Sequence, residues 1–326
     1  MIARTVTAAL LVSTLTSSCG TNESRPDRST TPLSRRPQGT SGNLVVTRVG
    51  HLPSPMQLPS AVTISGGRVL SLGGLSAADV STDGVVLVDK SDRPRMVGRL
   101  PRPVHDSAAA SIGGRSYLFG GADFAPSSDI LRVSENGRTS SAGRLPIVAS
   151  DVAAASIGSR AYVVGGYTGT TPLRSIVSFV PGQPVRAVAR LPRPLRYAAV
   201  AAAAGSLYIA GGTSGTTAQR AVLRFDPGTR RVTQVGKLPQ PLTHAAGASL
   251  GGRFYVVGGR GAALDSASSA IWVIDPHTGR VRSSGRLPLA LSDIGAASTP
   301  DHIVLVGGRD RGGQAHDDVF TARAAR

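Results

Sequence analysis

The fold is decided by the stretch LPRPLRYAAVAAAAGSLYIAGGTSGTTAQRAVLRFDPGTRRVTQVGK, residues 191–237. Four short apolar or alternating runs, separated by turn residues, fall at 198–203, 207–210, 221–225 and 232–235. The sequence Asp-Pro-Gly-Thr at 226–229 predicts a tight turn between the last two runs, because Pro fixes φ and Gly accepts a positive φ. We therefore expect this stretch to form a four-stranded antiparallel sheet.

The same unit occurs six times along the chain. Leu-Pro pairs begin at Leu52, Leu100, Leu145, Leu191, Leu238 and Leu287. Gly-Gly pairs begin at Gly73, Gly120, Gly165, Gly211, Gly258 and Gly307. The first Gly follows the Leu by 21 residues in the first copy and by 20 in the other five. A sheet with two apolar faces has to be covered on both, so we expect the copies to stack radially as an all-β, six-bladed β-propeller of four-stranded antiparallel blades.

The units resemble the kelch repeat, in which the second strand ends in Gly-Gly and carries an aromatic residue shortly before it. Three residues ahead of the pair stand Tyr117, Tyr162, Tyr208 and Tyr255. The resemblance covers about residues 42–326 and implies a propeller that binds its ligands around a central channel. Leu70 and Val304 replace the tyrosine in the first and last copies.

A second departure from the kelch pattern concerns tryptophan. The tryptophan typical of the fourth strand is absent, and Trp272 falls in a predicted third strand. Val232 and Val281 stand where that tryptophan would pack, so we expect a more tightly packed version of the repeat.

The last copy is one strand short. Its third strand is predicted at 319–323, and the sequence then ends without a fourth run. Residues 44–49 run straight into the first Leu-Pro, as every other fourth strand does. We predict that these residues pair with 319–323, complete the last blade and remove its exposed edge.

Residues 1–19 resemble a bacterial lipoprotein signal peptide, with a basic start, an apolar run, and small residues before Cys19, the one cysteine of the chain. This resemblance predicts export and acylation of Cys19, which would anchor the protein on the outer side of the cell membrane. The alternative is an ordinary cleaved signal and a secreted protein. Residues 20–41 are polar and are expected to be a disordered tether, and residues 42–326 are expected to form the propeller.

The chain is strongly basic, with 36 Lys and Arg against 19 Asp and Glu and a net charge of +17. The residue before each Leu-Pro is basic in every copy: His51, Arg99, Arg144, Arg190, Lys237 and Arg286. Export, few aromatic residues and the spread of the arginines over all copies argue against nucleic acid as the partner. Anionic envelope polymers or lipid head groups fit this charge better.

The best candidate for a site lies between each Leu-Pro and the first strand. Five residues past each Leu come Gln57, His105, Ser150, Arg196, Thr243 and Ser292, and six past come Leu58, Asp106, Asp151, Tyr197, His244 and Asp293. The residue after each Gly-Gly is Leu75, Ala122, Tyr167, Thr213, Arg260 or Arg309. The kelch resemblance places all three sets around one mouth of the channel.

Ten of these positions are candidate ligand-binding residues, because their chemistry differs from copy to copy while the scaffold repeats. They are His105, Asp106, Asp151, Arg196, Tyr197, His244, Asp293, Tyr167, Arg260 and Arg309. The alternative is that these groups satisfy loop backbones and cap turns. The sequence leaves open which of the two adjacent registers points into the channel.

Kelch propellers include a copper radical oxidase and a periplasmic sialic acid epimerase. The first needs a cysteine cross-linked to a tyrosine, and is excluded because the sole cysteine lies in the predicted signal. No ligand spacing indicates a metal, so we expect no metal and no cofactor. We expect a monomeric binding module for a protein or glycan of the cell envelope. The alternative is a carbohydrate-active enzyme of the epimerase or mutarotase type, with Asp and His residues of the same site as acid and base.

Overall fold

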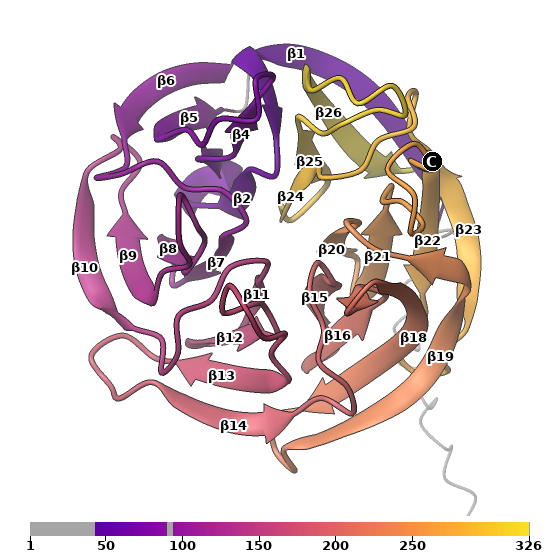
Figure 1. Ribbon diagram of the computed structural model, residues 1–326. Helices are drawn as coiled ribbons and strands as arrows, with labels where there is room; N and C mark the ends of the chain where they lie inside the picture. Colours follow the sequence, from indigo (N-terminus) through magenta and orange to yellow (C-terminus); the bar gives the residue numbers. More distant parts are fainter. Residues whose placement is uncertain (1–42, 90–93, 326) are drawn as a thin grey trace, which may run out of the picture. The chain divides into compact units, whose positions relative to one another are not determined.

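The computed structural model describes residues 43–89 and 94–325, and these form six β-sheets arranged in a ring (Figure 1). A single 3-10 turn, η1 (Ser65–Gly67), is their only helical element. Within these ranges, no helix has the length and apolar character that a membrane crossing requires. The predicted all-β, six-bladed propeller is confirmed. The predicted signal (1–19) and tether (20–41) lie outside the described residues.

The strands of the first three blades follow one another in the sequence from the inner to the outer edge. Blade 1 contains β2 (Ser60–Thr63), β3 (Val69–Leu72), β5 (Gly84–Val88) and β6 (Pro94–Arg99). Blade 2 contains β7 (Ala108–Ile112), β8 (Arg115–Phe119), β9 (Asp129–Val133) and β10 (Thr139–Arg144). Blade 3 contains β11 (Ala153–Ile157), β12 (Arg160–Val164), β13 (Ser175–Phe179) and β14 (Arg186–Arg190).

The remaining blades keep the same order, with short additions. Blade 4 contains β15 (Ala199–Ala203), β16 (Ser206–Ala210), β18 (Thr217–Asp226) and β19 (Arg231–Leu242), with β17 (Thr213–Ser214) paired to β18. Blade 5 contains β20 (Ala246–Leu250), β21 (Arg253–Val257), β22 (Ala270–Ile274) and β23 (Val281–Arg286). Blade 6 contains β24 (Gly295–Ser298), β25 (Ile303–Val306), β26 (His316–Ala324) and β1 (Leu44–Gln57), and β4 (Leu75–Ser76) pairs with β1.

The core lies between neighbouring blades, because each sheet is apolar on both faces. Between blades 2 and 3, Phe179 packs edge-on against Tyr117 and Phe119, with ring centroids 5.1 and 5.4 Å apart. Tyr208 is buried and donates its hydroxyl to the carbonyl oxygen of Pro276 in the next blade. Aromatic pairs of this geometry add to the burial of apolar area. The tyrosines ahead of Gly-Gly therefore hold one blade to the next.

The fixed distance between Leu-Pro and Gly-Gly has a geometric cause. The N–H of the second Gly donates to the carbonyl oxygen four residues past the Leu of the following blade, at 2.8–2.9 Å in all six blades. A Cβ on the first Gly would lie 2.2–2.4 Å from that same oxygen, and both glycines have a positive φ. Only glycine fits here, so the two landmarks form one repeated blade-to-blade joint.

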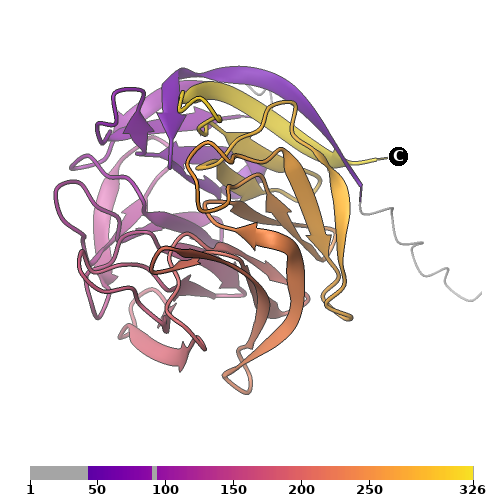
Figure 2. The same cartoon turned by 45° about the vertical axis from the view of Figure 1, so that its right-hand side comes forward.

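The ring is closed by the first strand of the chain, as predicted. β1 pairs antiparallel with β26 from Leu44↔Ala324 to Met56↔His316 (Figures 1 and 2). The pairing extends beyond the predicted 44–49 because the backbone continues in the same direction past two register shifts. The strands and core clusters that the structure describes belong to one compact unit, so residues 42–326 hold the contacts of the propeller.

Two local expectations can be compared with the structure. In the turn at 226–229 the side chain of Asp226 accepts the backbone N–H groups of Gly228 and Thr229, but the positive φ falls on Arg230, not on Gly228. The prediction for glycine was wrong because the Asp side chain already satisfies the turn and moves the left-handed residue to its end. Trp272 does lie in the third strand, β22. Val232 and Val281 are partly buried against the core clusters.

Candidate functional site

Six residues from six blades surround one mouth of the channel, and we call them the mouth ring. They are Leu58, Asp106, Asp151, Tyr197, His244 and Asp293, each six residues past its Leu, and all have φ between 52° and 60°. In five of them the N–H donates to the carbonyl oxygen of the ring residue of the preceding blade, at 2.8–3.2 Å. Left-handed φ is unfavourable for residues with a side chain, so these backbone bonds hold the strained conformation in place.

The mouth ring answers which register points inward. Its residues and their immediate successors line a cavity of about 120 Å³. The residues five past each Leu pair instead with the residue after Gly-Gly, as in Ser150↔Tyr167 and Thr243↔Arg260. The residues six past each Leu therefore point into the channel. The residues five past each Leu join the segment between Leu-Pro and the first strand to the loop that follows Gly-Gly.

The side chain of Asp106 is buried and forms no ion pair with an arginine or lysine among the described residues. Its Oδ2 accepts a hydrogen bond from the Tyr197 hydroxyl at 3.1 Å, and its Oδ1 has no hydrogen-bond partner among the described residues. Burial raises the pKa of Asp106 well above its ordinary value, and the nearby carboxylates of Asp151 and Asp293 raise it further. Asp106 therefore keeps its proton to a higher pH than an exposed carboxyl group does.

With the substitution Asp106→Asn, the free energy of unfolding should fall less as the pH rises than it does in the parent. The folded pKa of Asp106 lies above the unfolded value of about 3.9, so the folded state keeps a proton that the unfolded state releases. The stability due to this proton is complete below the unfolded pKa and is lost as the pH rises toward the folded pKa. In urea denaturation, the free energy of unfolding of the variant should gain on that of the parent as the pH rises above the unfolded pKa of about 3.9. A difference that does not change with pH would contradict a raised pKa of Asp106.

Arg196 is held rigidly at the mouth by three neighbours. Its Nε donates to Oδ2 of Asp151, a side chain only 3% exposed. Its guanidinium carbon lies 3.9 Å from the ring centroid of Tyr167 and 5.2 Å from that of Tyr197. About 24% of the Arg196 side chain stays exposed. A clamped guanidinium of this kind is prepared to bind a planar anionic or polar group.

His244 is neutral, and both of its ring nitrogens are occupied. Arg260 can only donate, so its contact at 3.1 Å makes Nε2 of His244 an acceptor, and Nδ1 faces the hydroxyl of Thr243 at 3.1 Å. Burial lowers the pKa of His244 to about 2, with help from Arg260 and Arg196. The ring also stacks on Tyr197, with centroids 3.7 Å apart. His244 therefore positions Tyr197.

The other candidates lie along the same mouth. Asp293 accepts the hydroxyl of Ser292 at 2.5 Å, and burial raises its pKa. Nδ1 of His105 faces Ser81, its Nε2 lies 3.7 Å from Asp106, and burial lowers its pKa. All ten predicted site residues thus belong to the mouth ring or to the positions bridged above it.

Sequence reasoning missed part of the site on blade 1. Arg309 approaches Gln57 at 3.5 Å and Asp79 at 3.9 Å, and Gln57 donates to Asp79 at 2.6 Å. Asp79 lies in the loop between β3 and β5, and this loop differs in sequence from copy to copy, so no repeated register could have identified the residue. Its left-handed φ of 55° was also not visible in the sequence.

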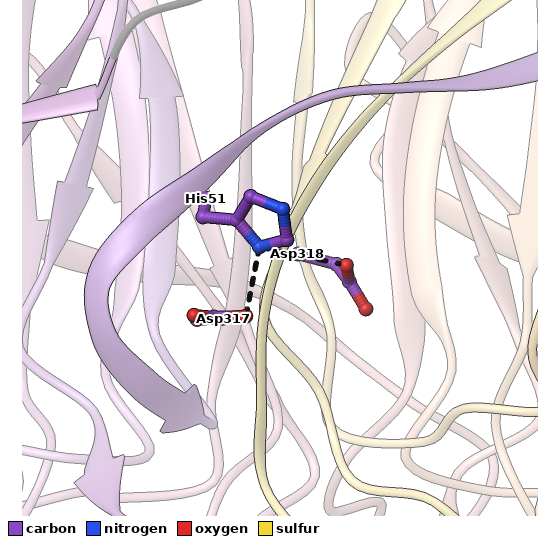
Figure 3. Close-up of side chains that lie close together, drawn as sticks. All are labelled: His51, Asp317 and Asp318. Atoms are coloured by element: carbon purple, nitrogen blue, oxygen red, sulfur yellow. Dashed lines mark hydrogen bonds and ion pairs between the residues drawn. The ribbon is translucent and has the colours of Figure 1, made fainter.

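A separate cluster on β1 and β26 has the composition of a metal site. His51, Asp317 and Asp318 bring one ligand atom each to within 4.8 Å of one another (Figure 3). His51 contacts Asp317 at 3.0 Å, while Arg48 forms an ion pair with Asp318 at 2.7 Å. The guanidinium already supplies the positive charge that a metal ion would bring. This cluster is therefore best described as an ion-pair network at the ring closure.

Comparison with known proteins connects this geometry to a repeat family. The kelch motif matches residues 194–239 and 241–285, which span blades 4 and 5. Among curated proteins none matches the chain. Among solved structures, the structure of YjhT is similar with a TM-score of 0.72, at 16% identity, over 82% of this chain and 95% of that one. At this identity the likeness concerns the fold alone.

Proposed function

We propose that this six-bladed kelch-repeat propeller is an exported, membrane-tethered binding module that takes a protein or glycan of the cell envelope at the mouth ring. Acylation at Cys19 would hold it on the outer side of the cell membrane, and an ordinary cleaved signal would make it a secreted protein. It acts as a monomer, without nucleic acid, metal or cofactor. The proposal is supported by the sequence resemblance of residues 1–19 and by the chemistry of the mouth.

The observation that carries the proposal is the clamped guanidinium of Arg196. Asp151 and Tyr167 come from the preceding blade, so two blades cooperate to hold one exposed donor group. Tyr197 connects this clamp to Asp106, because its ring lies beside the guanidinium of Arg196 and its hydroxyl donates to Oδ2 of Asp106. Tyr197 and Asp151 line the cavity, and Arg196 is held against both of them. A rigid donor beside a small cavity reduces the entropy lost on binding.

We expect the substitution Arg196→Lys to weaken ligand binding at least about tenfold, because lysine keeps the charge beside Asp151 but lacks the planar fork that stacks on Tyr167. The probe is residues 42–326, screened against solubilised envelope proteins and a glycan array. The matched control is Arg193→Lys, which makes the same change three residues earlier at an exposed arginine without an ion pair among the described residues. A ligand bound equally by both variants would exclude the mouth as its site.

A second candidate function is a carbohydrate-active enzyme of the epimerase or mutarotase type. It is favoured by two members of the mouth ring whose pKa values are shifted in opposite directions: burial raises the pKa of the Asp106 carboxyl group and lowers that of His244. Binding without turnover fits the geometry better, because Arg260 and Thr243 occupy both nitrogens of His244. Substitution of Asp106, Asp151, Tyr197 and His244 separates the two: turnover of a bound sugar would be lost in an enzyme, whereas a binding module loses affinity only.

A further inference from the structure

We call the face of the ring opposite the mouth the turn face. It carries the turns that join the first strand of each blade to the second, and the third strand to the fourth. Antiparallel strands that start at the mouth must reverse there. Six arginines in or beside these turns are exposed and make no ion pair or side-chain hydrogen bond with any described residue. They are Arg115, Arg138, Arg186, Arg230, Arg231 and Arg280.

The acidic groups described on the turn face do not balance its arginines because they are fewer, although they keep their negative charge when they accept hydrogen bonds. Asp226 and Asp275 accept backbone N–H groups of their own turns, which lowers the pKa of both. Glu135 pairs with Arg68, and Asp301 pairs with Arg323. Among the described residues, the turn face therefore carries a surplus of free positive charge.

Three arginines near the mouth donate hydrogen bonds to backbone carbonyl groups. Arg174 donates to the carbonyl oxygens of Leu191 and Pro192, and Arg220 does the same to those of Leu238 and Pro239. Arg311 donates to the carbonyl oxygen of Ala267. These side chains brace the segments that lead from one blade to the next. Part of the basic composition is thus structural near the mouth, where Arg190, Arg193 and Arg286 remain exposed, whereas six unpaired arginines gather on the turn face.

The free arginines spread over blades 2 to 5 and do not converge on one cavity. A small anion could contact one or two of them, whereas a flat anionic surface can contact them together. The chain also enters the propeller on this face, because Leu44 at the start of β1 pairs with Ala324 at the end of β26. Residue 43 follows Cys19 by 24 positions in the sequence.

We propose that the turn face binds the anionic phospholipid headgroups of the membrane and so directs the mouth ring away from the membrane. The location at a membrane rests on the proposed function; the charge of the turn face does not. Each arginine near an anionic bilayer contributes about fivefold to the partition coefficient, and salt screens this attraction.

The test compares two variants of residues 42–326 that lose the same charge. The first is Arg186→Gln/Arg230→Gln/Arg280→Gln on the turn face. The control is Arg190→Gln/Arg193→Gln/Arg286→Gln, three exposed arginines near the mouth ends of their blades. Partition onto vesicles of phosphatidylglycerol and phosphatidylcholine is measured by cosedimentation. Melting curves of both variants confirm that they are folded.

We expect the parent to bind anionic vesicles, the control to stay within about threefold, and the turn-face variant to lose roughly a hundredfold. Equal losses in both variants would show that net charge alone acts, and would overturn the proposal. Absence of binding to anionic vesicles, together with binding to soluble poly(glycerol phosphate), would assign the face to a polymer and also overturn it. Ligand capture that depends on Arg196 would be unaffected by either result, so failure here is distinguishable from failure of the mouth site.

Discussion

Deletion of residues 42–50 should lower the melting temperature of the propeller by more than about 10 °C, because several kcal/mol of stability are lost at once. The deletion removes the pairing of β1 with β26 from Leu44 to Gly50, and takes buried Leu44 out of the core between blades 5 and 6. It also leaves β26 as an exposed edge. Calorimetry or circular dichroism measures the change. An unchanged melting curve would contradict closure by β1.

A cross-link tests the same closure without removing any residue. Val45 and Arg323 are directly paired and exposed, so Val45→Cys/Arg323→Cys can form a disulfide across the joint. Residues 42–326 contain no other cysteine. The oxidised variant should melt higher than its reduced form, because the cross-link restricts the unfolded chain. Equal melting of a fully oxidised and a reduced sample would show that the joint does not limit stability.

The substitution Gly165→Ala should destabilise the protein by more than about 3 kcal/mol, the range of severe steric conflict. A Cβ at this position would lie 2.2 Å from the carbonyl oxygen of Leu195, and the φ of +62° adds strain. The obstacle is backbone of the next blade, so it cannot turn aside as a side chain could. Because the joint repeats, Gly211→Ala should behave alike, with its Cβ 2.3 Å from the oxygen of Leu242.

The matched control for this prediction is Gly182→Ala. Gly182 has a φ of +78°, but a Cβ there meets no atom within 4 Å. It should therefore cost only about 1 kcal/mol, the strain of a left-handed residue. Urea denaturation of both variants separates strain from collision. Similar losses for Gly165→Ala and Gly182→Ala would mean that the Gly-Gly joint is not a tight contact.

The fold could be predicted from the sequence because its decisive contacts repeat. The contact between Gly-Gly and the segment after the next Leu-Pro occurs six times, so a chance match in one copy does not change the prediction. Strand lengths were less accessible. β18 and β19 run well past the predicted apolar runs, because backbone pairing continues through polar residues such as Gln219 and Lys237.

The sequence predicted which residues lie around the mouth of the channel, but not how they contact one another. The register of the mouth ring was visible, since six copies differ there. Its inward direction was not, because a left-handed residue breaks the alternation from which side-chain direction is read. The clamp of Arg196 joins residues of two blades, and Tyr197 reaches Asp106 two blades away. Whether residues of different blades meet depends on the angle between the blades, which cannot be read from the sequence.

The proposed ligand site at the mouth ring is tested most directly by one titration. The ligand captured by residues 42–326 is titrated into the parent, Arg196→Lys and Arg193→Lys, and the dissociation constants are compared by calorimetry. A clamped Arg196 predicts at least about tenfold weaker binding for Arg196→Lys, and binding within about twofold of the parent for Arg193→Lys. Equal affinity of all three proteins would contradict a ligand site at the mouth ring.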